Sequence, residues 1–143
     1  MKKLLAILLL SASAPAALAD VHYIHSDDGG VVSQYIAKYD RWAKAGDEAI
    51  VAGPCYSACV YVTRVPKACA TPAGVFILHR AFYVKNIKKP ASQQPHYYSA
   101  KIDKASIALY PDVVRRAIAR RGGLTKKWMT IRASEILPLC QEG

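Results

Sequence analysis

The chain has 143 residues, of which 52 % are apolar and 21 % charged, and its formal net charge is +10 at pH 7. This balance is typical of a globular protein with its own core and excludes an intrinsically disordered chain. The length fits one domain, and the sequence contains no repeat, low-complexity tract or internal linker.

The first nineteen residues have the three parts of a secretory signal peptide. Lys2 and Lys3 form a positive start, residues 4–10 an apolar stretch, and Ala17-Leu18-Ala19 a small-x-small cleavage site. The apolar stretch is too short to span a bilayer, although an uncleaved anchor is the alternative. We therefore expect a signal peptide over residues 1–19 and an exported domain, periplasmic or secreted, over residues 20–143, beginning at Asp20.

The next segment predicts a strand, a turn, a helix and a second strand. Residues 21–25 alternate like a short strand, and the turn that follows ends in Gly29-Gly30. Ser33 is the expected cap of the helix, Gly46 its stop, and residues 48–52 form a buried strand. His22 and His25 lie an odd number of residues apart on the first strand, hence on opposite faces, which disfavours metal binding by both.

The segment that follows places a serine and a histidine at the ends of two elements. Gly53-Pro54 turns the chain, and residues 57–64 form a helix that ends before Pro66. Residues 74–78 are an apolar strand that leads directly into His79. Ligands of open α/β sheets gather at the carboxyl ends of the strands, so His79 lies where chemistry is expected.

After His79 the order of elements changes. Residues 85–95 are basic and contain two prolines, which predicts a surface loop, with His96 also at the surface. Helices are expected over residues 97–109 and 111–121, then a short strand over residues 128–131 and a turn at residues 134–137. This alternation predicts an α/β fold, a single domain with a mainly parallel sheet and flanking helices.

The basic charge lies almost entirely in the second part of the chain. Residues 20–79 contain five Lys/Arg and six Asp/Glu, whereas residues 80–132 contain thirteen Lys/Arg and two Asp/Glu. Such a block could bind an anionic envelope surface, although a solvated basic face is the simpler interpretation. No nucleic-acid-binding motif accompanies it, so nucleic acid is not expected as a partner.

Four cysteines in an exported chain predict disulfide bonds. Cys55, Cys59, Cys69 and Cys140 allow three pairings, which the sequence cannot separate. Cys55 and Cys59 are four residues apart at an expected helix start, a strained geometry, so we expect each to pair with a distant cysteine. A zinc site is the rival, but the paired C-x-x-C spacing of structural zinc is missing, and we expect no metal and no cofactor.

Ser57 and His79 have the placement of a nucleophile and its base. At the first turn of a helix the backbone N–H groups are unpaired, so the N–H of Ala58 is a natural donor to an oxyanion. Gly29-Gly30 could supply a second donor, because glycine lets the backbone approach a ligand closely. The simpler alternatives are that Ser57 only caps its helix and that His79 is a surface histidine with satisfied hydrogen bonds.

The order of these parts resembles the Clp protease proteolytic subunit family, ClpP, within the ClpP/crotonase superfamily. The matching parts are Gly29-Gly30-Val31-Val32, then residues 53–58, then Pro72 to His79. The resemblance implies Ser57 as the nucleophile, His79 as the general base, and the N–H groups of Gly30 and Ala58 as the oxyanion hole. The chain looks closest to small exported ClpP-like proteins with a Cys-x-Ser-Ala-Cys signature.

Three features depart from the family pattern. Where the family has its catalytic acid, residues 128–132 contain none; Thr130, a backbone carbonyl, or one of Asp103, Asp112 and Glu135 are the candidates for its role. The family's handle element is replaced by the basic segment at residues 85–95, so ring assembly does not follow. Asp27-Asp28 precedes the Gly-Gly turn and would oppose an oxyanion if the carboxylates faced inward.

The sequence therefore predicts an exported, ClpP/crotonase-like serine hydrolase, peptidase-like, that acts on a peptide or protein through Ser57 and His79. The alternative is a catalytically silent relative that binds an envelope component through its basic C-terminal half. A hydrogen bond between the Ser57 hydroxyl and a ring nitrogen of His79 would favour the enzyme.

Overall fold

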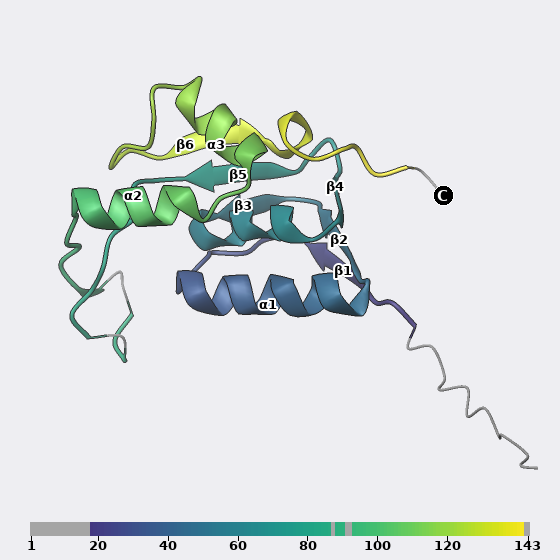
Figure 1. The fold of residues 1–143 in the computed structure, drawn as a ribbon, viewed down its shortest axis with the longest axis horizontal. Helices are drawn as coiled ribbons and strands as arrows, with labels where there is room; N and C mark the ends of the chain where they lie inside the picture. The colour runs from purple at the N-terminus through teal and green to yellow at the C-terminus, as the bar shows by residue number, and fades with distance from the viewer. Residues whose placement is uncertain (1–17, 87, 91–92, 142–143) are drawn as a thin grey trace, which may run out of the picture.

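The computed structural model describes residues 18–86, 88–90 and 93–141. Most of the expected signal peptide, including its positive start and its apolar stretch, lies outside the described residues. The described part forms a mixed α/β structure in which strands make a central layer, with α1 (Val32–Ala45) at one side and α3 (Asp112–Ala119) at the other (Figure 1).

The first sheet is parallel throughout. Its strands are β1 (Val21–Ile24), β2 (Glu48–Val51) and β4 (Lys67–Ala70), in the order β1-β2-β4. The last side chain of each strand is apolar and buried, because the carboxyl ends of these strands pack against the core.

The second sheet contains β3 (Pro54–Tyr56), β5 (Val75–Leu78) and β6 (Met129–Arg132), in the order β3-β5-β6. The first pair is parallel and the second antiparallel. Two residues separate β2 from β3, so this stretch of chain bends from one sheet into the other. Gly53 permits the bend, because an added Cβ would overlap the carbonyl oxygen of His25.

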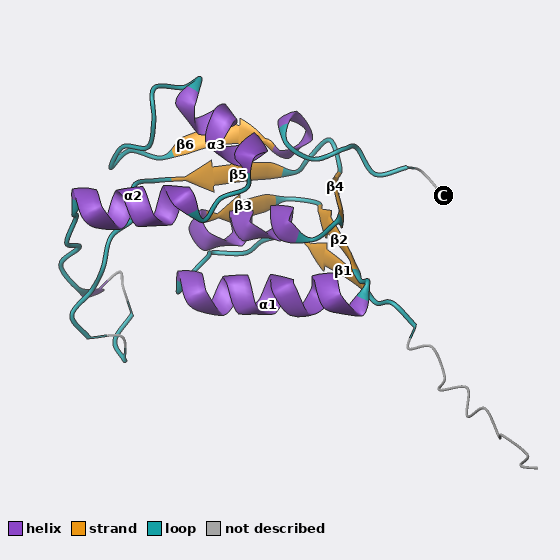
Figure 2. Ribbon diagram, in the orientation of Figure 1, coloured by secondary structure: helices purple, strands orange, loops and turns teal. Residues whose placement is uncertain are grey.

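The helices cover the strands and enclose the core (Figure 2). Besides α1 and α3 they are the 3-10 helix η1 (Ser57–Arg64), α2 (Ala100–Ala108) and the short η3 (Ala133–Glu135). Side chains from α1, η1, β5 and β6 supply most of the largest fully buried positions, among them Tyr39, Tyr61, Phe76, Leu78 and Ile131. Residues 58–62 of η1 are all buried, so the helix that begins at Ser57 is part of the core.

Several expected elements differ from those observed. β3 and β4 were not predicted, because each is short and rich in residues of weak strand propensity, such as proline, alanine and cysteine. The strands therefore form two sheets and not one mainly parallel sheet. Ser33 lies inside the first turn of α1, whose cap position is Val31, so it is not the expected cap. The first helix after His79 begins at Ala100.

The cysteines form two disulfides, Cys55–Cys59 and Cys69–Cys140. The expectation that Cys55 and Cys59 pair with distant cysteines was wrong, because Cys55 lies on β3 and not in a helix. The chain turns a corner between the two residues, which brings their Cα atoms to 5.3 Å. The second bond fixes the C-terminal segment to β4, beside a bridge between Ala70 and Leu139.

Between β5 and α2 the described residues form loops and turns, as the prolines and charges predict, apart from a bridge between Tyr83 and Tyr97 and a 3-10 conformation at Gln93. Among the described helices, none has both the length and the apolar character needed to cross a membrane.

Candidate active site

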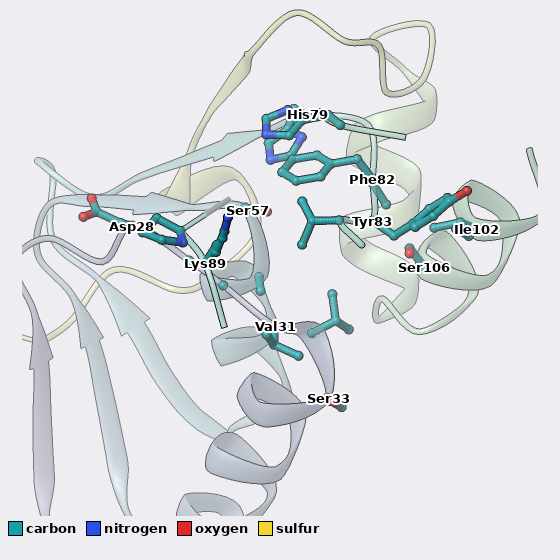
Figure 3. Close-up of a pocket in the computed structure, with 18 of the residues that line it drawn as sticks. Asp28, Val31, Ser33, Ser57, His79, Phe82, Tyr83, Lys89, Ile102 and Ser106 are labelled. Carbon is teal, nitrogen blue, oxygen red and sulfur yellow. The ribbon is translucent and has the colours of Figure 1, made fainter. Parts of the chain in front are cut away.

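A cavity of about 1000 Å³ opens between the entry to α1, the start of η1, the segment after β5, and α2. Its lining includes Gly30, Ser57, Ala58, His79, Phe82 and Ile102. Figure 3 shows Ser57 on one wall, with Val31 and Ser33 at the α1 side and Tyr83, Ile102 and Ser106 at the α2 side. The cavity brings together all four residues that the sequence singled out for an active site.

Ser57 occupies a strained corner. Its φ is 51°, and it is the only non-glycine residue with positive φ in the described part of the chain. Tyr56 before it ends β3 and Ala58 after it is buried in η1, so the backbone must change direction at Ser57 itself. A non-glycine residue in this conformation costs about 1–3 kcal/mol and is typical of functional positions.

Two backbone N–H groups beside Ser57 have no partner. Neither the Gly30 nor the Ala58 N–H donates a hydrogen bond within the described residues. The Gly29-Gly30 turn packs against the corner, since a Cβ on Gly29 would lie 3.0 Å from the Ser57 Cβ and 3.2 Å from the Ala58 nitrogen. Gly30 and Ala58 both line the cavity that Ser57 lines, so their unpaired donors are candidates for an oxyanion hole.

Asp27 holds this turn in place. Its Oδ1 accepts hydrogen bonds from the Gly29 N–H (2.9 Å) and the Tyr35 hydroxyl (2.5 Å), and its Oδ2 pairs with Lys38 (3.4 Å). Burial, and then the bond to Asp27, raises the pKa of Tyr35, so the phenol stays a donor. Asp27 thus faces its partners and not the oxyanion position. Asp28 lines the cavity, but in Figure 3 its carboxylate is turned away from Ser57.

His79 follows β5 directly and is fixed in one tautomer. Its Nδ1 lies 2.7 Å from the backbone carbonyl oxygen of Arg80. A carbonyl can only accept, so Nδ1 bears the proton and Nε2 retains its lone pair. Burial lowers the pKa of His79, a nearby His96 lowers it further, and the Arg80 carbonyl acts in the opposite direction. The ring is therefore neutral at pH 7, as a general base must be.

Aromatic rings surround His79. The Trp128 ring contacts it edge to face, with ring centres 4.4 Å apart. The Phe82 ring stacks on it, with ring centres 5.3 Å apart. His96 is exposed in the loop, as predicted, and its ring stacks on Phe82 at 3.8 Å where it lines the cavity. These contacts restrict rotation of the His79 ring.

No hydrogen bond joins the Ser57 hydroxyl to His79, although both line the same cavity. Catalytic hydrogen bonds are often long in structures without substrate and tighten when the substrate binds. The structure thus places the two groups in one site without the direct contact that would have favoured the enzyme most.

Among the candidates that the sequence left open for the role of the acid, the structure places only a backbone carbonyl, that of Arg80, against the His79 ring. Two hydrogen bonds hold Arg80, which supplies this carbonyl. Its side-chain Nε donates to Oδ2 of Asp103 at 2.5 Å, and its backbone N–H donates to the carbonyl of Thr125 at 2.7 Å. Asp112 and Glu135 pair instead with Arg115 and Arg121. Thr130 is exposed on β6.

A second polar cluster, which the sequence did not reveal, lies at the opposite ends of the strands. Asp20, His22 and Asp47 each place a potential metal-ligand atom within 4.8 Å of the others. Asp47 comes from the loop before β2, far in sequence from the other two, so no local spacing announces the cluster. His25 stacks on Tyr23 at 5.8 Å, which confirms that His22 and His25 do not share a face.

No family model matches the sequence, and no curated protein is significantly similar to it. The functional argument therefore depends on the residues of this chain and their geometry.

Proposed function

We propose that the chain is an exported serine hydrolase, peptidase-like, with Ser57 as nucleophile and His79 as general base. One observation carries the proposal: Ser57 is held at φ 51° beside two unpaired N–H groups, in a cavity that His79 shares. Each of these features is common by itself: a strained serine, unpaired N–H donors beside it, and a neutral histidine with a fixed orientation. Their combination in one site is typical of enzymes that catalyse acyl transfer.

In this mechanism the Ser57 Oγ attacks a substrate carbonyl and passes its proton to Nε2 of His79. The N–H groups of Gly30 and Ala58 stabilise the tetrahedral oxyanion. His79 then protonates the leaving group, which departs as an ester forms on Ser57. Water, activated by His79, attacks that ester and releases the acid, which restores the serine.

The lining of the cavity favours a substrate with an apolar group next to the scissile carbonyl. Val31, Val32, Phe82 and Ile102 present apolar side chains to it. Such a surface binds an aliphatic or aromatic group through burial alone, at about 25 cal/mol per Å² removed from water. Peptides or esters with an apolar acyl part are therefore the substrates to test first.

We assign the fold, within the same proposal, to the ClpP/crotonase-like architecture. The order of a Gly-Gly turn, a strand, a serine corner and a strand that ends in histidine supports the assignment, as does the bend of β2 into β3. Export is part of the proposal: the disulfides are compatible with an oxidising compartment.

A fluorophosphonate probe tests the nucleophile directly. The oxidised chain over residues 20–143 should be labelled at Ser57, as located by peptide mapping, and Ser57→Ala should abolish labelling. Ser33→Ala is the matched control, since Ser33 also lines the cavity but lacks the strained corner. Failure of the parent chain to react, together with no hydrolysis of peptides or esters, would remove the enzyme proposal.

A second candidate function is a catalytically silent binding module. The missing Ser57–His79 hydrogen bond favours it, and so does the exposed basic surface of α3 and the segment after it, formed by Arg115, Arg116, Arg120, Lys126 and Lys127. Co-sedimentation with anionic lipid vesicles tests this function. Binding that weakens strongly with added salt supports it, because surface charges are screened beyond about 10 Å at 0.1 M salt.

A further inference from the structure

Asp47 is the one buried charged residue among the described residues, with a side chain only 8 % exposed. Its Oδ1 accepts a hydrogen bond from the backbone nitrogen of Asp20 at 3.1 Å, and its Oδ2 lies 2.8 Å from Nε2 of His22. Both carboxylate oxygens are therefore directed at the amino end of β1.

A buried carboxylate is costly unless a cation pairs with it. In the uncleaved chain the Asp20 nitrogen is a neutral amide, so Asp47 has no direct contact with a permanent positive charge. Hydrogen bonds from His22 and Asp20 hold the pKa of Asp47 below its usual range, with Lys67 acting only at longer range. The carboxylate is thus ionised in a place that lacks a full counter-charge.

The nitrogen that meets Asp47 is the one that the expected signal-peptide cleavage would convert into an amine. Leu18 is 94 % exposed, Ala19 is exposed as well, and β1 begins at Val21, so the Ala19–Asp20 bond lies just outside the fold. Figure 1 shows this segment leading away from the domain. The small-x-small motif and the position of Asp47 are independent observations that select the same bond.

We propose that cleavage after Ala19 creates an ion pair between the new α-ammonium group of Asp20 and the buried Asp47 carboxylate, which fixes the processed amino terminus to the sheet. Cleavage adds one water across the peptide bond, leaving a carboxylate on Ala19 and an amine on Asp20 that takes up a proton. The pair then forms without rearrangement, because the nitrogen is already 3.1 Å from Oδ1.

The surroundings of the pair keep it in position. The Glu48 N–H donates to the Asp20 carbonyl at 2.9 Å, and His22 stacks on Trp42 at 3.8 Å between ring centres. Asp20 is thus held through its carbonyl and its nitrogen, and the second oxygen of Asp47 is already in contact with the His22 ring, which the stack on Trp42 orients. An ammonium at this place gains a charge-assisted hydrogen bond at little entropic cost.

The ion pair should make the free energy of unfolding depend on pH in both the basic and the acidic range. The titratable and charged groups that face it are His22 on β1, Lys67 on β4 and the Asp20 carboxylate. An ammonium paired in the folded state has a raised pKa, so its contribution is complete below its unfolded value of about 8 and is lost as the pH rises from there through the raised folded value. Asp47 has a lowered pKa, so its contribution is present above its ordinary value of 3.8 and is lost in stronger acid.

The test compares three chains that differ only at the amino terminus. One begins at Asp20, one retains Ala19, and one begins at Asp20 with an acetylated amine. Intact mass of the exported protein first shows which residue begins the natural chain. Urea unfolding at pH 7 should give the free Asp20 chain a folding equilibrium constant about tenfold above the other two, which corresponds to an amine pKa raised by about one. The advantage should disappear at pH 10.

Asp47→Asn in the free and the Ala19-retaining chains completes the cycle and should abolish the difference between them. If that variant does not fold, the comparison with the acetylated chain and an NMR titration of the α-amine still test the proposal. The pKa of the amine should lie above its ordinary value of about 8.

Four results would overturn the proposal. They are an exported chain that begins elsewhere, equal stability of the free and Ala19-retaining chains, a difference that survives Asp47→Asn, and a difference that a metal chelator removes. The last would instead assign Asp20, His22 and Asp47 to a metal ion. None of these results involves Ser57, so the outcome is independent of the proposed hydrolase.

Discussion

Two histidines at opposite ends of the strands have closely similar surroundings. His22 at the start of β1 stacks on Trp42 at 3.8 Å and has one ring nitrogen 2.8 Å from Asp47. His79 after β5 meets Trp128 at 4.4 Å and has one ring nitrogen 2.7 Å from the Arg80 carbonyl. The two sites differ in the charge of the acceptor and in which nitrogen it occupies.

This difference distinguishes a structural histidine from the general base that we propose. A carboxylate holds a proton on the His22 nitrogen that faces it and ties the ring to the sheet. A neutral carbonyl orients His79 without adding negative charge, and burial then lowers its pKa. His79 is left with Nε2 available in the cavity, whereas His22 is engaged in the cluster at the amino ends of the strands.

The largest expected effect comes from removing each histidine in turn. His79→Gln should reduce the rate at which the fluorophosphonate probe labels Ser57 by about 10²–10⁴-fold, the contribution of a general base. His22→Gln should leave that rate unchanged, because His22 lies at the other end of the strands. Rates from timed labelling and mass spectrometry measure both. Equal effects of the two substitutions would show that His79 is not the base.

Substitution of Gly29 should disturb the reactive end alone. An added Cβ would overlap the Tyr56 carbonyl and force a left-handed conformation at φ 74° on alanine. We expect Gly29→Ala to lower the free energy of unfolding by about 3 kcal/mol and to slow Ser57 labelling.

Gly122→Ala is the control for Gly29→Ala. Gly122 also has positive φ, at 83°, but its added Cβ would meet nothing within 4 Å. This variant should lose about 1 kcal/mol, the conformational cost alone, and keep normal labelling. Equal losses of stability in the two variants would mean that the turn does not pack against the Ser57 corner. Chemical denaturation measures both.

A smaller effect on Ser57 labelling should follow when the Arg80 carbonyl, which accepts a hydrogen bond from His79, is held less firmly. Asp103 holds Arg80, so Asp103→Asn should let the Arg80 carbonyl move and slow Ser57 labelling by about tenfold, in proportion to the lost orientation of a base. Asp112→Asn is the matched control, because Asp112 pairs with Arg115 at the surface. The ¹⁵N NMR spectrum of His79 should also show less of the Nδ1–H tautomer in Asp103→Asn. An unchanged tautomer would rule out this positioning role.

The smallest expected effect is a displacement of the pH profile. Because burial lowers the pKa of His79, the acid limb of Ser57 labelling should have its midpoint below 6.5, the ordinary value. A histidine with a depressed pKa also reduces stability as the pH falls from its unfolded pKa towards its folded one. His79→Gln should remove that part of the pH dependence of unfolding. A midpoint at or above 6.5 would contradict the burial of His79.

Local patterns explain what the sequence could predict. Apolar runs identified β2 and β5, the stop signals at Gly46 and Pro66 located helix ends, and the Ser57 to His79 order placed both residues on one cavity. These features depend on neighbouring residues and on the rule that strand ends gather ligands.

Features that depend on tertiary contacts were missed. Cys55 lies on a three-residue strand that is held by tertiary pairing with β5 and by a bridge to Asp27, so its bond to Cys59 could not be foreseen. The cluster around Asp47 joins residues 25 positions apart, and the Arg80 carbonyl is invisible to any motif because it is backbone. The stack of His96 on Phe82 likewise depends on a tertiary contact, although the exposed loop position of His96 was predicted.

The Cys69–Cys140 bond makes the stability of the fold depend on the redox state of its surroundings. It closes a loop of 71 residues that contains His79, Arg80 and Asp103 but not Ser57. Closing a loop of this length restricts the unfolded chain by about 4 kcal/mol, a large part of the 5–15 kcal/mol that holds a typical domain together. Reduction would remove this restriction and would also open the Cys55–Cys59 bond on either side of Ser57, so that both the serine corner and the segment that holds His79 lose a covalent constraint. For the proposed hydrolase, we therefore expect oxidation of the cysteines to complete the site.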